Sequence, residues 1–180
     1  MYFSCYCDGA IKNNGKKNPN APIFGGIGIV FLNQKREIIK KTYMGFTEEG
    51  KYKHITNNVM ELAAVINAIK IFVSKISSNA FCDVLDIYSD SQYVVNGWND
   101  GLSRWIKNGW CVNTGEEVSN KDMWKELLKI SRDNRCPVFR IYHVKGHDKN
   151  EFNNIADELA VIGKEKVIEQ WEAKKLLKHS

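Results

Sequence analysis

Short apolar runs, separated by turn-forming residues, occupy the first quarter of the chain. The runs at 2–8, 26–32 and 37–46 are rich in β-branched and aromatic residues, which favour strands. A loop with Asn-Asn-Gly and two prolines follows the first run, and a polar turn at 33–36 joins the other two. Three strands connected in this way predict an antiparallel meander.

From Thr56 onward the hydrophobic pattern changes to the period of a helix. Apolar residues recur at spacings of three and four, at Leu62, Val65, Ile66, Ile69, Phe72, Val73 and Ile76. This stripe predicts an amphipathic helix with Thr56 as its N-cap.

The remaining pattern alternates between strands and helices. The expected elements are a strand at 84–89, helical segments at 91–98 and 102–108, a helix at 121–132 preceded by Ser119 or Asn120, a strand at 138–144, and a helix from Asn153 or Asn154 to about Leu177. Gly163 is expected to be a weak point in the last helix. This order predicts a single α/β domain over 1–180, with a helical extension over about 164–178.

Four carboxylates lie where the predicted elements begin or end. Asp8 and Asp90 end two strands, and Glu61 and Asp157 lie in the first turns of two helices. Glu61 lies beside the buried stripe, which is an unfavourable place for a charge without a partner. Taken singly, each acid is more simply a cap, a surface charge or a salt-bridge partner, and Asp90 suits an N-cap.

The same acids can also form one site. If the first and fourth strands are neighbours, Asp8 and Asp90 end side by side and repel each other unless a cation lies between them. Oxygen ligands of this kind suit Mg²⁺ or Mn²⁺. Spacing alone leaves this hypothesis open beside the simpler alternatives.

Composition indicates a globular protein of one domain. The 180 residues are 43% hydrophobic and 26% charged, and no apolar run approaches the roughly 18 residues of a membrane span. We expect no signal peptide and no membrane association. Five scattered cysteines, with Cys5 and Cys7 on one face of a strand, favour reduced thiols and a cytoplasmic location. The net charge of +5 permits a polyanionic partner.

Six short segments resemble type 1 ribonuclease H in their order and spacing. They are Tyr6-Cys7-Asp8-Gly9, Thr56-Asn57-Asn58-Val59-Met60-Glu61, Tyr88-Ser89-Asp90-Ser91-Gln92-Tyr93, Asn108-Gly109-Trp110, Val144-Lys145-Gly146-His147 and Ala156-Asp157-Glu158-Leu159-Ala160. One such segment means little alone. The ordered set, which covers nearly the whole chain, makes the resemblance specific.

The resemblance implies a fold, an activity and a metal site. The implied fold is a ribonuclease H-like, five-stranded mixed sheet in the order 3-2-1-4-5, flanked by helices. The implied activity is that of a monomeric endoribonuclease, which hydrolyses the RNA strand of an RNA–DNA hybrid and leaves 5′-phosphate and 3′-hydroxyl ends. The implied site binds two Mg²⁺ ions, or Mn²⁺ in their place, through Asp8, Glu61, Asp90 and Asp157.

The resemblance also assigns residues to proton transfer and to substrate binding. His147 is similar to a mobile histidine that moves protons or assists product release, although a lone histidine in a polar loop is more simply a surface residue. Recognition of a hybrid requires contacts that detect 2′-hydroxyls on one strand only. The residues assigned to groove contacts or to a DNA phosphate are Asn14, Thr56, Asn57, Asn58, Gln92, Trp105 and Asn120.

The chain departs from the family pattern in its basic protrusion. Gly101 stands where the family often has a tryptophan, whereas Trp105 matches a second one. Residues 100–132 include six basic and five acidic side chains, so this region is nearly neutral. Positive charge is concentrated at 12–17, at 35–41 and in the tail, where the lysines are interpreted as a solvated helix face, with hybrid contacts as the alternative.

Three rival interpretations remain beside a hybrid-specific endoribonuclease. An integrase-type nuclease on a similar fold would share the strand-end carboxylates but typically lacks the Thr-Asn-Asn-x-x-Glu segment and the Gly-His loop. A nucleic-acid-binding module without catalysis predicts a missing carboxylate, and none of the four is missing. An interaction protein would use the amphipathic C-terminal helix.

Overall fold

The computed structural model, which describes residues 1–12, 22–77, 79, 82–133, 135–145 and 150–177, contains one five-stranded sheet. Its strands are β1 (Tyr2–Lys12), β2 (Phe24–Leu32), β3 (Ile38–Thr47), β4 (Val84–Ser89) and β5 (Val138–His143). They lie in the order β3-β2-β1-β4-β5. The first three pair antiparallel, whereas β4 is parallel to both β1 and β5. The predicted meander and strand order are therefore confirmed.

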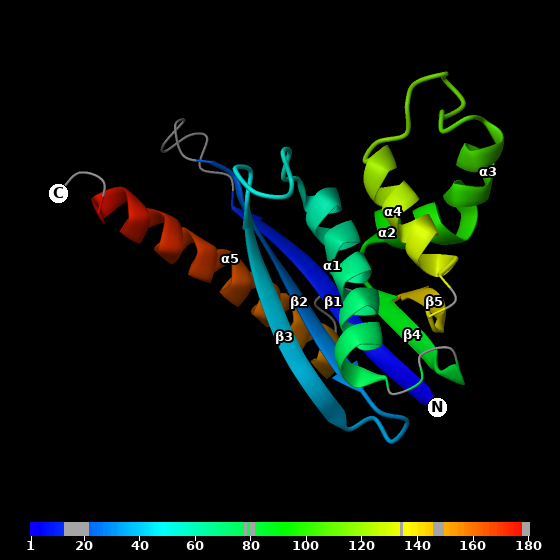
Figure 1. The fold of residues 1–180 in the computed structure, drawn as a ribbon, viewed down its shortest axis with the longest axis horizontal. Helices are drawn as coiled ribbons and strands as arrows, with labels where there is room; N and C mark the ends of the chain where they lie inside the picture. Colours follow the sequence, from blue (N-terminus) through cyan, green and yellow to red (C-terminus); the bar gives the residue numbers. More distant parts are fainter. Residues whose placement is uncertain (13–21, 78, 80–81, 134, 146–149, 178–180) are drawn as a thin grey trace.

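Helices cover both faces of this sheet (Figure 1). They are α1 (Asn57–Ile71), α2 (Gln92–Asn96), α3 (Leu102–Lys107), α4 (Lys121–Ser131) and α5 (Glu151–Leu177), with π-helical turns at Phe72–Ile76 and Gly97–Gly101. α1 lies on one face and α5 on the other, while α2, α3 and α4 gather on the side of β4 and β5 (Figure 1). Among the described segments, no helix combines the length and the apolar character that a membrane crossing requires.

The main hydrophobic core lies between the sheet and α1. Most of the predicted helical stripe is buried there, and Leu62, Ile66 and Ile69 have no exposed surface, whereas Val73 and Ile76 are partly buried. β2 is buried along its whole length because α1 covers one of its faces and α5 the other. The sequence pattern and the Thr56 cap thus place α1 as predicted.

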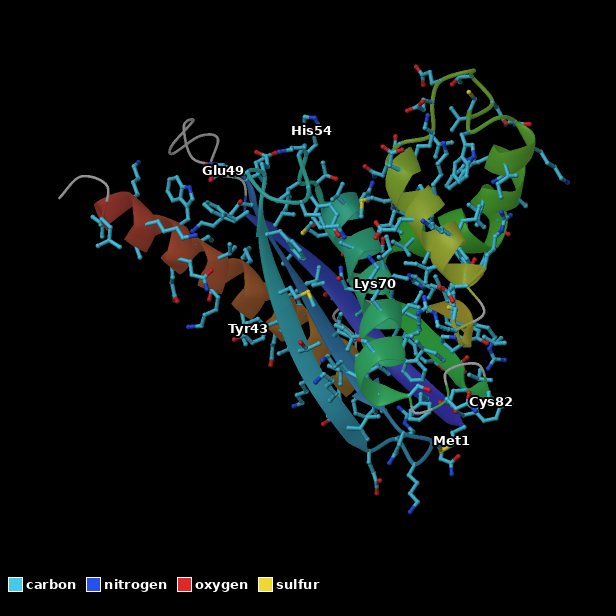
Figure 2. The ribbon with its side chains drawn as sticks, in the orientation of Figure 1. Met1, Tyr43, Glu49, His54, Lys70 and Cys82 are labelled. Atoms are coloured by element: carbon cyan, nitrogen blue, oxygen red, sulfur yellow. The ribbon has the colours of Figure 1, made fainter. Side chains whose placement is uncertain are left out.

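The first residue ties the start of β1 to the start of β4. The terminal ammonium of Met1 lies 2.7 Å from the carboxylate of Asp83, and Cys82 lies beside it (Figure 2). Residues Tyr2 to Tyr6 then pair in parallel register with Val84 to Tyr88. This contact helps to hold the register that aligns the far ends of the two strands.

β1 extends beyond its predicted end at Asp8. It pairs with β2 as far as Lys12, which lies opposite Phe24. The prediction was wrong because β1 separates from β4 after Tyr6 while its other edge remains paired. Asp8 therefore lies inside a strand, at the point where one of its two neighbours leaves.

α5 also begins earlier than predicted, at Glu151. The side-chain oxygen of Asn150 accepts hydrogen bonds from the backbone N–H groups of Phe152 and Asn153, at 3.2 and 3.3 Å. Asn150 is thus the capping residue, and the choice of Asn153 or Asn154 as the start was wrong.

α5 lies so close to the sheet that glycines are required at the contact. A Cβ atom on Gly28 would lie 1.9 Å from the carbonyl oxygen of Ala156, and one on Gly163 would lie 2.5 Å from that of Met44. Gly163 is buried in this contact, and α5 continues unbroken through it. The helix therefore does not break at Gly163, and the glycine there permits the close approach to β3.

We predict that Gly28→Ala destabilises the fold by about 2–4 kcal/mol, because the new methyl group forces α5 away from β2. Gly50→Ala is the matched control, since its Cβ atom would meet nothing closer than the Thr47 carbonyl oxygen at 3.2 Å. Urea unfolding of both variants measures the difference. Equal midpoints for the two variants would contradict the account of the helix–sheet contact.

Candidate active site

Asp8 and Asp90 come together because β1 and β4 are parallel. The last paired residues of these strands are Tyr6 and Tyr88, and each carboxylate lies two residues further along its chain. From there β1 continues beside β2, whereas the chain after Ser89 turns into α2. Both acids therefore lie at the point where the sheet opens.

Glu61 reaches the same point from α1 because Gly9 allows the helix to approach the strand. A Cβ atom on Gly9 would lie 2.6 Å from the backbone nitrogen of Glu61. No other residue fits in this position without moving α1 away from β1. Sequence reasoning missed this role of Gly9, although it directly follows Asp8 in the motif.

These three acids form a compact cluster at the opening of the sheet. One carboxylate oxygen from each of Asp8, Glu61 and Asp90 lies within 4.8 Å of the others. Asp8 is 6% and Glu61 5% exposed, and Asp90 is half-buried. The backbone N–H of Gly9 donates to Asp8 Oδ1 at 2.7 Å, while Glu61 Oε2 is buried without a hydrogen-bond partner.

Burial and mutual repulsion raise the proton affinity of this cluster. Burial, followed by the charge of Asp90, raises the pKa of Asp8 to about 6. Burial and the nearby Asp8 raise the pKa of Glu61 to about 10. Without a cation the cluster therefore retains a proton on Glu61 at neutral pH.

The three side chains fit a divalent cation. They supply only oxygen donors, which Mg²⁺ and Mn²⁺ prefer. The unpartnered Glu61 oxygen is a buried acceptor that a cation would satisfy, because a buried polar atom without a partner is costly. Asp157, on α5, lies outside this compact set and is half-buried, but its charge also raises the pKa of Asp8. It therefore borders the cluster on the side of α5.

Asp90 is not the N-cap of the following helix. The cap is Ser91, whose hydroxyl accepts a hydrogen bond from the backbone N–H of Val94 at 3.4 Å. The simpler interpretation of Asp90 was therefore wrong. Its carboxylate is free of a capping role and belongs to the cluster.

The described residues that were predicted to bind the substrate lie on several elements. Thr56 caps α1 by accepting from the backbone N–H of Val59 at 3.2 Å. Asn57 and Asn58 are exposed in the first turn of α1, before Glu61, and Gln92 is exposed at the start of α2. Two predicted residues, Asn14 and His147, lie outside the described residues.

The hydroxyl of Tyr93 joins α2 to the start of α4. It accepts hydrogen bonds from Trp124 Nε1 at 2.9 Å and from Asn120 Nδ2 at 3.0 Å, and it donates to the carbonyl oxygen of Ser119 at 3.1 Å. Asn120 occupies the N-cap position of α4 with φ 57°, in the left-handed region that asparagine tolerates, and its side chain does not cap the helix. Sequence reasoning missed Tyr93, whose only signal is its place after Gln92.

The side chain of Trp105 is partly buried and partly exposed to solvent. Its ring is half-buried against Trp124, with centroids 5.3 Å apart. A Cβ atom on Gly101 would lie 2.7 Å from the Trp105 ring, so the glycine makes room for it. The neighbouring Trp98 stacks on Phe139 with ring centroids 4.9 Å apart.

A model of the RNase H family matches residues 2–165. The chain belongs to the RNase H family. It is 39% identical over 158 residues to the protein named Ribonuclease H of Acetivibrio thermocellus, which covers 87% of this chain and 90% of that protein. This membership favours the ribonuclease H interpretation over the integrase-type and structural alternatives.

Solved structures of the family share the fold. The PFV RNase H domain in solution superposes with a TM-score of 0.68 at 26% identity, over 90% of this chain and 93% of that domain. The foamy viral protease-reverse transcriptase in complex with an RNA/DNA hybrid superposes with a TM-score of 0.67 at 25% identity. That match covers 90% of this chain but only 20% of the viral protein.

We predict that Glu61→Gln stabilises the metal-free protein by about 1–3 kcal/mol at pH 8. The folded state holds the Asp8 and Glu61 protons more tightly than the unfolded chain does. The stability of the wild type therefore falls as pH rises from about 4, through the folded pKa of Asp8 at about 6 and toward that of Glu61 at about 10.

Urea unfolding in EDTA between pH 4 and pH 9 measures this effect. The gain from Glu61→Gln should shrink toward pH 4, where Glu61 is protonated in the folded state and mostly protonated in the unfolded state. Glu165→Gln, at an exposed position on α5, is the matched control and should change stability little at any pH. A loss of stability in Glu61→Gln at pH 8 would show that Glu61 is instead a structural ion-pair partner.

Proposed function

We propose that this chain is an endoribonuclease that hydrolyses the RNA strand of RNA–DNA hybrids. The observation that carries the proposal is the cluster of Asp8, Glu61 and Asp90, with its unpartnered buried oxygen, in a chain of the RNase H family. A viral relative of the same fold binds an RNA/DNA hybrid, which supports the choice of substrate. One chain supplies all four predicted acids, so we expect a monomer to be active.

Asp8, Glu61 and Asp90 would hold one divalent ion, and Asp157 would help to hold a second. The ions would be Mg²⁺, or Mn²⁺ in its place. Bound there, the two ions would stabilise charge on the entering and leaving oxygens of the phosphodiester and lower the pKa of the attacking water. The acids contribute by fixing these positions between α1 and the opening of the sheet. Their mutual repulsion destabilises the site without metal, and a bound cation would relieve this repulsion.

The remaining residues would orient the hybrid and move a proton. Attack of water on the RNA phosphate breaks the bond to the 3′-oxygen, which leaves as a hydroxyl, while the phosphate stays on the 5′ end. His147 would carry a proton to or from this site, or help the product to leave, because its ordinary pKa lies near neutrality. The proposed substrate contacts are Asn14, Asn57, Asn58 and Gln92 in the groove, Thr56 and Asn120 at a DNA phosphate, and Trp105 beside the DNA strand.

A cleavage assay with three labelled substrates tests the proposal. The wild type should cut the RNA of an RNA–DNA hybrid in Mg²⁺, and it should leave RNA duplex and DNA duplex intact. Addition of EDTA should abolish cleavage. Asp8→Asn should lower turnover by about a hundredfold or more, whereas Glu165→Gln, with the same change in charge, should not. Equal cleavage of DNA duplex, or full activity in EDTA, would refute the proposal.

We predict that His147→Ala lowers kcat by about tenfold to a hundredfold with little change in hybrid affinity. A residue that moves a proton or assists release acts after the substrate has bound. Steady-state kinetics with a separate binding measurement distinguishes the two effects. A large loss of affinity at unchanged kcat would make His147 a binding residue instead.

A further inference from the structure

α5 continues for twelve residues beyond the part of the chain that the family model matches. The match ends at residue 165, and the helix ends at Leu177. We call residues 166–177 the C-terminal extension. It contains one tryptophan, Trp171, and two adjacent lysines, Lys174 and Lys175. Figure 1 shows this part of α5 reaching past the sheet at the end where the chain terminates.

The first half of the extension is fixed to the sheet. The Trp171 ring meets the buried Phe24 ring edge-on, with centroids 5.6 Å apart. Val167 lies against Gly45 of β3, where a glycine Cβ atom would be only 2.7 Å from the Val167 Cβ. The tail is therefore not simply a helix surrounded by solvent, since its apolar side holds it in a defined place.

A cavity of about 310 Å³ lies between the extension and the end of β3. Its polar lining includes Thr47, Glu49, Lys51, Gln170 and Lys174. Lys51 and Lys174 therefore share an open surface at this cavity, together with Glu49.

Lys174 and Lys175 carry charge that is available to a ligand. Neither forms an ion pair within the described part of the chain, in contrast to Lys166, which pairs with Glu169 at 3.2 Å. The Lys175 ammonium lies 5.2 Å from the centre of the Trp171 ring. Of the two acids before α1, Glu48 accepts hydrogen bonds from the backbone N–H groups of Ile23 and Ile55, at 3.2 and 3.4 Å.

The extension lies at the same end of the sheet as the start of α1. Gly25 of β2 lies against Ile55 and Met60, and the adjacent Phe24 meets Trp171. His54 and Glu49 mark this end in the loop between β3 and α1 (Figure 2). The extension therefore lies at the same end of the sheet as the start of α1, where the proposed hybrid contacts lie, although α5 covers the opposite face.

The distance from the carboxylates suits a contact with a long duplex. Asp157 and Lys174 are seventeen residues apart on one helix, which corresponds to about 26 Å along its axis. At about 3.4 Å per base pair, this is the length of about eight base pairs. A duplex cut at the carboxylates could therefore place its backbone beside the extension, several base pairs away.

We propose that Lys174 and Lys175, positioned by Trp171, bind the sugar–phosphate backbone of the hybrid about eight base pairs from the site of cleavage. This inference rests on the proposed function, because the hybrid is the polyanion proposed to bind at the carboxylates. Flexible ammonium groups neutralise phosphates without reading sequence. The contact supplies positive charge that the nearly neutral region 100–132 does not.

Binding to hybrids of two lengths tests the contact. The full chain with Lys174→Gln and Lys175→Gln is compared with the wild type, both in an Asp8→Asn background that prevents cleavage. Lys40→Gln with Lys41→Gln is the matched control, since it removes two neighbouring charges from β3. The hybrids have about 24 and about 6 base pairs, and a circular dichroism spectrum checks the fold of each variant.

On the long hybrid, the tail variant should flatten the salt slope of binding by about one to two units. The ratio of wild-type to variant affinity should then fall about tenfold between 50 and 200 mM salt. The short hybrid should show little difference, and the control should change the slope less than the tail variant does.

Three outcomes of these salt-series measurements would overturn the inference. They are an unchanged slope on the long hybrid, an equal effect on both hybrids, and an equal effect of the control pair. Competition by polyglutamate as effective as competition by unlabelled hybrid would also overturn it, in favour of an acidic protein partner. Cleavage by the wild type is measured separately, so failure of the proposed function and failure of this contact are distinguishable.

Discussion

Repulsion among buried carboxylates is the constraint on which the rest of the site depends. Asp8 and Glu61 are almost fully buried, and Asp90 lies within 4.8 Å of both. Burial of like charges is unfavourable without a proton or a cation between them. The raised pKa values of Asp8 and Glu61 favour a bound proton. The unpartnered oxygen of Glu61 is an acceptor for a cation. The protein gives up stability at this point to hold a site that a divalent cation completes.

The backbone holds the acids in place through very close contacts between helices and strands. Gly9 lets α1 approach β1, so that Glu61 reaches Asp8. Gly28, which pairs with Asp8 across β1 and β2, lets α5 lie against the opposite face and brings Asp157 toward the cluster. The two helices thus approach one strand pair from opposite sides, and an added methyl group at either glycine would separate an acid from its partners. The geometry of the site is therefore a property of the helix–sheet packing.

Local patterns predicted the elements, whereas contacts between distant residues decided the details. The hydrophobic stripe of α1 and its Thr56 cap could be predicted because both depend on residues that are close in the sequence. The buried role of Gly163 could not, because it depends on β3, more than a hundred residues away. The three hydrogen bonds of the Tyr93 hydroxyl also join separate segments. For the acids, only the resemblance to a family connected Asp8 with Glu61 in advance, since spacing alone allowed each to be an ordinary surface charge.

The most direct test of this account is thermal unfolding of the metal-free protein with increasing Mn²⁺. A ligand that binds only the folded state stabilises it by mass action, by about 2.7 kcal/mol at a hundredfold excess over its Kd. The account predicts a saturable rise in Tm for the wild type, a much smaller rise for Asp8→Asn, and a wild-type-like rise for Glu165→Gln. An equal rise in Tm for the wild type and Asp8→Asn would contradict the claim that the carboxylate cluster is a metal site.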